Sequence, residues 1–119
     1  MIDKRNSSRI KVNIAGKISH SNNKANIVHI ESINRNGFLC SLKNKIPVAK
    51  GVAISILFPD RTKDSVFTST HVSGMGVVLR KVNKLNENKL THSFAVKFTE
   101  LEEEDACVID SFLTRTSHN

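Results

Sequence analysis

The chain has 119 residues, of which 39% are hydrophobic and 24% charged, enough for one domain with a single core and too few for two. It has no apolar run near the roughly 20 residues of a membrane-spanning helix, and no apolar stretch follows the basic N-terminus as in a secretory signal, so we expect a cytoplasmic protein without membrane insertion. Residues 1–99 hold 17 of the 18 Lys and Arg but only 5 of the 11 Asp and Glu. This balance favours an anionic ligand, with an ordinary solvated basic surface as the alternative.

Alternation of apolar and polar residues predicts the strands in chain order. Asn36-Gly37 is a strong hairpin signal, and Gly74 and Gly76 indicate a bend or bulge in a segment that forms either one long strand or two. We expect strands in the alternating stretches 10–19, 27–30, 38–42, 52–58, 66–82 and 94–98.

The spacing then changes to that of a helix. Thr99 with Glu102 is typical of a capping box, and the apolar residues that follow lie on one face of an amphipathic helix. The pattern predicts a single domain over 1–119, with a mobile basic arm (1–9), a β-barrel (10–98) and a C-terminal helix (100–114). The fold class is therefore mainly β, a small closed barrel with one helix.

Apolar neighbours and strand phase predict several buried side chains. Two are the thiols of Cys40 and Cys107, which cannot form a disulfide scaffold or a four-ligand zinc site by themselves. The others are phenylalanines assigned to the core rather than to a base-stacking surface: Phe38, Phe58, Phe94, Phe98 and Phe112.

The sequence offers no constellation for catalysis. Its five histidines are scattered without metal-ligand spacing, no serine lies in a Gly-x-Ser-x-Gly elbow, and no phosphate-binding glycine loop of the Walker or dinucleotide type is present. We therefore expect no enzyme activity, no metal site and no cofactor.

Two short motifs point instead to a ligand. Arg5-x-x-x-Arg9 precedes the first strand, and Ser32-x-Asn34-x-x-Gly37 leads into the third. Together they resemble the two-part signature of the PilZ domain, a bacterial receptor module for cyclic di-GMP. The late segments 76–80 and 94–101 are similar to the family's closing strands, so the resemblance covers residues 3–114.

The resemblance implies a six-stranded antiparallel barrel with a C-terminal helix and a nucleotide clamp. Arg5 and Arg9 would hold guanine and phosphate of cyclic di-GMP, and Ser32, Asn34 and Gly37 would complete the pocket. The planar guanidinium group of arginine can donate two parallel hydrogen bonds either to phosphate oxygens or to O6 and N7 of guanine. Further positive charge could come from Lys4, Arg35 and Arg80.

The second motif departs from the family pattern at two positions. Ser32 stands where Asp or Asn belongs, and Asn34 stands where Ser belongs. A hydroxyl is a weaker acceptor for the guanine N1/N2 edge, so we expect a loss of about 0.5–1.5 kcal/mol, or roughly tenfold in affinity. Asn34 could supply a compensating amide, and both residues could instead make only turn hydrogen bonds.

Three functions remain open at this stage. The first is a receptor that binds cyclic di-GMP and relays the signal to a partner protein. The second is a degenerate PilZ-like domain that acts only through protein contacts. The third, a small basic barrel that binds RNA or single-stranded DNA, is disfavoured because Trp and Tyr are absent and such surfaces stack bases on exposed aromatic side chains.

Overall fold

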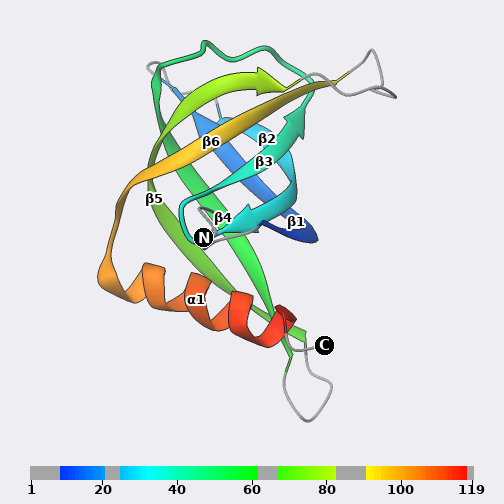
Figure 1. The fold of residues 1–119 in the computed structure, drawn as a ribbon, viewed down its shortest axis with the longest axis vertical. Helices are drawn as coiled ribbons and strands as arrows, with labels where there is room; N and C mark the ends of the chain where they lie inside the picture. The colour runs from blue at the N-terminus through cyan, green and yellow to red at the C-terminus, as the bar shows by residue number, and fades with distance from the viewer. Residues whose placement is uncertain (1–8, 21–24, 62–66, 83–90, 118–119) are drawn as a thin grey trace, which may run out of the picture.

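The computed structural model describes residues 9–20, 25–61, 67–82 and 91–117. These residues form an antiparallel barrel closed in the order β1-β2-β3-β6-β5-β4, followed by one helix (Figure 1). The elements are β1 (Ile10–Ser19), β2 (Ala25–Asn34), β3 (Gly37–Leu42), β4 (Gly51–Arg61), β5 (Phe67–Val82), β6 (His92–Leu101) and α1 (Glu103–Ser117). The predicted six-stranded barrel with a C-terminal helix is confirmed.

The core lies inside the barrel and is built by the alternation seen in the sequence. On β1, Ile14 and Ile18 point inward and are buried, while Lys11 and Lys17 are exposed. The rings of Phe38 and Phe98 lie 5.6 Å apart between centroids. All five phenylalanines predicted for the core are buried, so none of them is exposed for stacking on a base.

The segment that could form one strand or two is the single strand β5. Its pairing with β6 shifts register between Met75 and Gly76 and again between Val78 and Arg80. A Cβ at Gly76 would lie 2.6 Å from the carbonyl oxygen of Lys97, so the close approach of β6 requires glycine there. The bulge predicted in this segment is therefore confirmed.

The helix begins later than the sequence predicted. β6 continues through Leu101, and the amide of Ala106 donates to the carbonyl of Glu102 at 2.9 Å, which makes Glu102 the N-cap. The predicted capping box at Thr99 is wrong, because Glu100 and Leu101 pair with β5. Long-range strand pairing overrides the local capping pattern.

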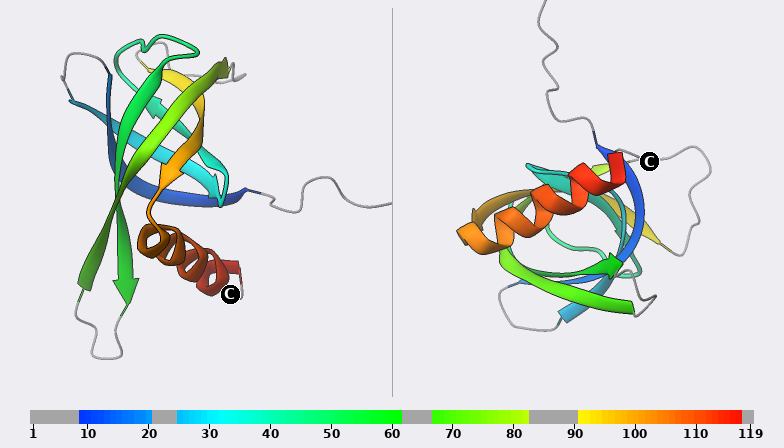
Figure 2. Two further views of the ribbon diagram at one scale, coloured as in Figure 1. Left: turned by 90° about the vertical axis from the view of Figure 1, so that its left-hand side faces the viewer. Right: turned by 90° about the horizontal axis from the view of Figure 1, so that it is seen from below.

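Helix α1 lies across one end of the barrel (Figure 2). It buries Ile109 and Phe112, and the ring of Phe112 lies 4.9 Å from that of Phe58 on β4. Three acids in its first turn face the partial positive charge of the helix N-terminus.

The two cysteines differ in environment. Cys40 on β3 is buried, and burial together with the nearby carboxylate of Glu31 raises the pKa of its thiol to about 12. The prediction that Cys107 is also buried is wrong: it is exposed. On α1, Cys107 precedes the buried Ile109 by two residues, so the helical phase turns it toward solvent.

Candidate ligand-binding site

Irregular pairing of β2 decides which way the second motif faces. Ile30 pairs with Cys40 and Ser32 pairs with Leu39, so Glu31 is an extra residue on β2. Before the bulge the even-numbered residues Val28 and Ile30 are buried, and after it the odd-numbered Ile33 is buried. Strict alternation from Ile30 would have turned Ser32 inward. The bulge instead places Ser32 and Asn34 on the outer face of the barrel, both half-buried.

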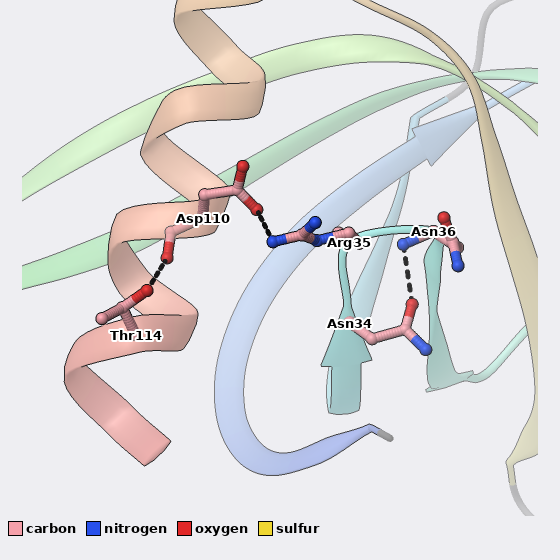
Figure 3. A network of polar contacts seen from close by, with 5 residues as sticks. All are labelled: Asn34, Arg35, Asn36, Asp110 and Thr114. Carbon is pink, nitrogen blue, oxygen red and sulfur yellow. Dashed lines mark hydrogen bonds and ion pairs between the residues drawn. The ribbon is translucent and has the colours of Figure 1, made fainter. Parts of the chain in front are cut away.

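Asn34 organises the turn between β2 and β3. Its side-chain oxygen accepts a hydrogen bond from the backbone amide of Asn36 at 2.7 Å (Figure 3) and another from the amide of Gly37 at 3.0 Å, which makes an Asx turn. The carbonyl of Asn36 in turn accepts from the amide of Phe98 at 2.8 Å. The turn-forming interpretation therefore holds for Asn34, and any compensation that it offers a ligand must come from its NH₂ donor.

Gly37 meets a steric demand of the fold. It is buried and pairs with Lys97 on β6. A Cβ at this position would overlap the carbonyl oxygen of Val96 and lie 3.0 Å from the Cα of Lys97. Its φ is not positive, so space, rather than turn geometry, requires glycine here.

Strand register brings the end of the first motif to the second. Ile10 pairs with Ile33, so Arg9, one residue earlier and exposed, lies at the level of Asn34 on the neighbouring strand. Arg5 and the accessory candidate Lys4 lie outside the described residues.

Two lysines at this site were not predicted. Lys11 pairs with Ser32 across β1 and β2, and Lys97 pairs with Gly37 across β6 and β3; both are exposed. Lys11 follows Arg9 at a spacing of two on a strand, so its outward phase could have identified it. Arg9, Lys11 and Lys97 thus surround the turn with positive charge.

The two remaining accessory candidates lie in different places. Arg35, at the tip of the turn, forms an ion pair with Asp110 on α1, its Nη2 3.1 Å from Oδ1, and the carbonyl of Asp110 accepts from the hydroxyl of Thr114 (Figure 3). Arg80 pairs with Ala95 on β6 and is three strands from Ser32, about 14 Å across the sheet. The structure thus links Arg35 to the helix and keeps Arg80 apart from the turn.

The described residues contain no group of three or more His, Cys, Asp or Glu side chains that could hold a metal ion. Nor does the described part of the chain include a helix both long and apolar enough to cross a bilayer.

Comparison with known proteins establishes the fold. No family model and no curated protein matches the sequence. The inhibitor of motility MotI/DgrA from Bacillus subtilis superposes with a TM-score of 0.79 and 13% identity, over 99% of this chain and 54% of that one, so this chain spans about half its length. The PilZ domain of YcgR from Escherichia coli, solved with c-di-GMP, superposes with a TM-score of 0.59 and 13% identity, over 98% and 96%. The chain therefore has the fold of a PilZ domain.

Proposed function

We propose that this domain is a non-catalytic receptor for cyclic di-GMP. Arg9, together with Arg5, holds a guanine and a phosphate, and Ser32 accepts from the guanine edge. Ligand binding orders the basic N-terminal arm against the barrel and changes a surface that a partner protein reads. The ligand is taken from the structural likeness to the PilZ domain of YcgR, which was solved with c-di-GMP.

The observation that carries the proposal is the β1–β2 register. In this register Ile10 pairs with Ile33 and Lys11 pairs with Ser32, and Arg9 directly precedes Ile10; Arg9 and Lys11 are both exposed. A cyclic dinucleotide carries two phosphates, and an arginine fork, a lysine and a hydroxyl can meet both its charge and its base edge. The bulge at Glu31 supports the proposal because it turns Ser32 outward.

Isothermal titration with cyclic di-GMP tests the proposal. We expect saturable binding by the wild type and about 5- to 150-fold weaker binding by Arg9→Ala, since a bidentate arginine contact is worth roughly 1–3 kcal/mol. Arg9→Lys keeps the charge and loses the fork, so it should also bind more weakly. Arg115→Ala, which removes an exposed arginine from the last turn of α1, is the matched control and should bind like the wild type. Equal affinity of Arg9→Ala and wild type would refute the site.

A second variant should gain affinity. Ser32→Asn restores an amide acceptor at the position where the resembling family has Asp or Asn. We expect binding of cyclic di-GMP to tighten by up to about tenfold, because one stronger hydrogen bond contributes roughly 0.5–1.5 kcal/mol. Unchanged affinity in a folded Ser32→Asn sample would mean that Ser32 does not contact the ligand.

One observation favours a second function. The side-chain oxygen of Asn34 already accepts hydrogen bonds within the turn, and the hydroxyl of Ser32 is a weaker acceptor than the Asp or Asn of the family pattern. The alternative is therefore a domain that has lost the nucleotide and acts through protein contacts. Absence of binding at high ligand concentration from a folded sample would select it. Binding of RNA or single-stranded DNA is less favoured, since the five core phenylalanines are buried.

A further inference from the structure

A groove lies on the outer face of β1, β2 and β3, beside the site described above. Its volume is about 680 Å³, within the usual range for small-molecule sites. The outward-facing residues that line it include Asn13 and Ala15 on β1, Ile27 and His29 on β2, Ser41 on β3 and, just after β3, Lys43. None of the described lining residues is acidic.

The groove and the motif turn share one continuous surface. In the groove, His29 pairs with Ala15 on one side and Ser41 on the other, and at the motif Ser32 pairs with Lys11 and Leu39. The two rows are two residues apart on β3, about 7 Å, and four residues apart on β1, about 13 Å. On β2 the two rows are three residues apart, with Ile30 and the extra residue Glu31 between them.

The groove combines an apolar surface with polar side chains. Ile27 is 73% exposed and pairs with Lys17 on β1, two residues beyond His29, the last residue of β2 that pairs with β3. His29 Nε2 lies 2.5 Å from Asn13 Oδ1, and Asn44 Nδ2 donates to Asn26 Oδ1 at 2.8 Å. An aliphatic surface beside imidazole, amide and hydroxyl groups suits a purine, whose face is apolar and whose edges both donate and accept.

We propose that this groove is a subsite for the second base of the same cyclic dinucleotide, an inference that rests on the proposed function. One guanine binds at Arg9 and Ser32, and the other purine lies against Ile27 beside His29. Lys43 supplies positive charge for a phosphate. Because the two bases of a cyclic dinucleotide extend from a single ring, a ligand anchored at the turn presents its other base to the adjoining surface. The second contact offsets the weaker acceptor at Ser32.

Two variants of the groove test the subsite. Ile27→Asp introduces an anion where the base and phosphate would lie, and His29→Ala removes an edge contact; both side chains are exposed, so the barrel should remain folded. We expect each to weaken cyclic di-GMP binding at least about fivefold in isothermal titration. The matched controls are Leu79→Asp, at a 50% exposed leucine on β5, and His71→Ala, at an exposed histidine that contacts Ser55 on the β4–β5 face.

A hybrid ligand separates a base contact from a general effect on the fold. The 3′,3′-linked cyclic GMP-AMP differs from cyclic di-GMP in one base only. We expect His29→Ala to change the affinity ratio between the two ligands at least about threefold, which a loss of folded protein would not do. Arg9→Ala should weaken both ligands.

The outcomes are distinguishable. Wild-type binding that persists unchanged in both groove variants would overturn the subsite and leave the receptor intact. Equal weakening by the groove variants and their controls would also overturn it. No binding of either ligand by the folded wild type would refute the receptor and the subsite together.

Discussion

Replacing Asn34 separates the role of this residue in the fold from its role toward a ligand. Its side-chain oxygen accepts from the amides of Asn36 and Gly37, and Asn34→Ala removes both hydrogen bonds. At about 0.5–1.5 kcal/mol each, their loss should lower the free energy of unfolding by about 1–3 kcal/mol. With an unfolding entropy of about 2.1 cal/mol/K per residue, the melting temperature should fall by about 4–12 °C.

Asn34→Asp is the discriminating companion. It keeps an acceptor oxygen in the same place, so its stability should stay within about 0.5 kcal/mol of the wild type. Arg35→Ala, in the same turn, is the control. It removes only an ion pair between side chains that are 66% and 48% exposed, and an exposed pair contributes about 0–1 kcal/mol. Thermal and urea unfolding followed by circular dichroism measure all three. Wild-type stability of Asn34→Ala, or equal destabilisation by Asp and Ala, would refute the turn assignment.

Three further predictions concern the fold. Gly37→Ala should destabilise the protein by more than about 2 kcal/mol through the clash with the β6 backbone, whereas Gly51→Ala, whose added Cβ has its nearest neighbour at 3.9 Å, should change stability by less than about 1 kcal/mol; equal urea midpoints would contradict this. Burial raises the pKa of Cys40 to about 12 from 9.0, so between these pH values the native state keeps a proton that the unfolded chain loses. This contribution to the unfolding free energy is complete below pH 9 and falls by up to about 1.4 kcal/mol per pH unit between 9 and 12. In urea unfolding from pH 8 to 11, the unfolding free energy should fall less steeply with pH for Cys40→Ala than for the wild type, and as steeply as the wild type for Cys107→Ser. Phe112→Ala should cost about 3–5 kcal/mol and accelerate amide exchange in α1 before the barrel strands, and uniform acceleration would argue against a helix that undocks separately.

Alternation was sufficient to predict most of the barrel. On β1, Ile14 and Ile18 face inward, whereas Lys11 and Lys17 face outward. This strand must therefore bury one face, whichever strands lie beside it. Closure also followed from the sequence, since several short strands with glycine bends leave few other ways to cover their edges.

Features that depend on distant pairing could not be predicted from local patterns. Thr99 and Glu102 satisfy a capping box, yet β6 continues past Thr99 because Leu101 pairs with Gly74. The contact of Arg35 with Asp110 joins two segments 75 positions apart in the chain, and no periodicity encodes it. Cys107 was predictable in principle, because its helical phase opposes that of the buried Ile109.

The bulge at Glu31 could be predicted in part from the sequence. The apolar residues Val28, Ile30 and Ile33 break strict alternation in the sequence, and the break marks where β2 gains a residue. Its position next to the second motif matters because one residue fewer would turn Ser32 into the core and leave the outer face without it. The same register change therefore preserves the core and exposes the candidate ligand residue.

The motif residues carry unequal weight as evidence for a ligand. Gly37 is required by the approach of Val96, and Asn34 is required by the turn, so a barrel of this shape would keep both even without a nucleotide. Arg9 and Ser32 differ, because one is exposed, the other half-buried on the outer face, and neither closes the turn. A match at Gly37 therefore reports mainly on the fold. The ligand hypothesis depends on Arg9 and Ser32, and binding measurements on these two positions decide between a receptor and a domain that has kept only the barrel.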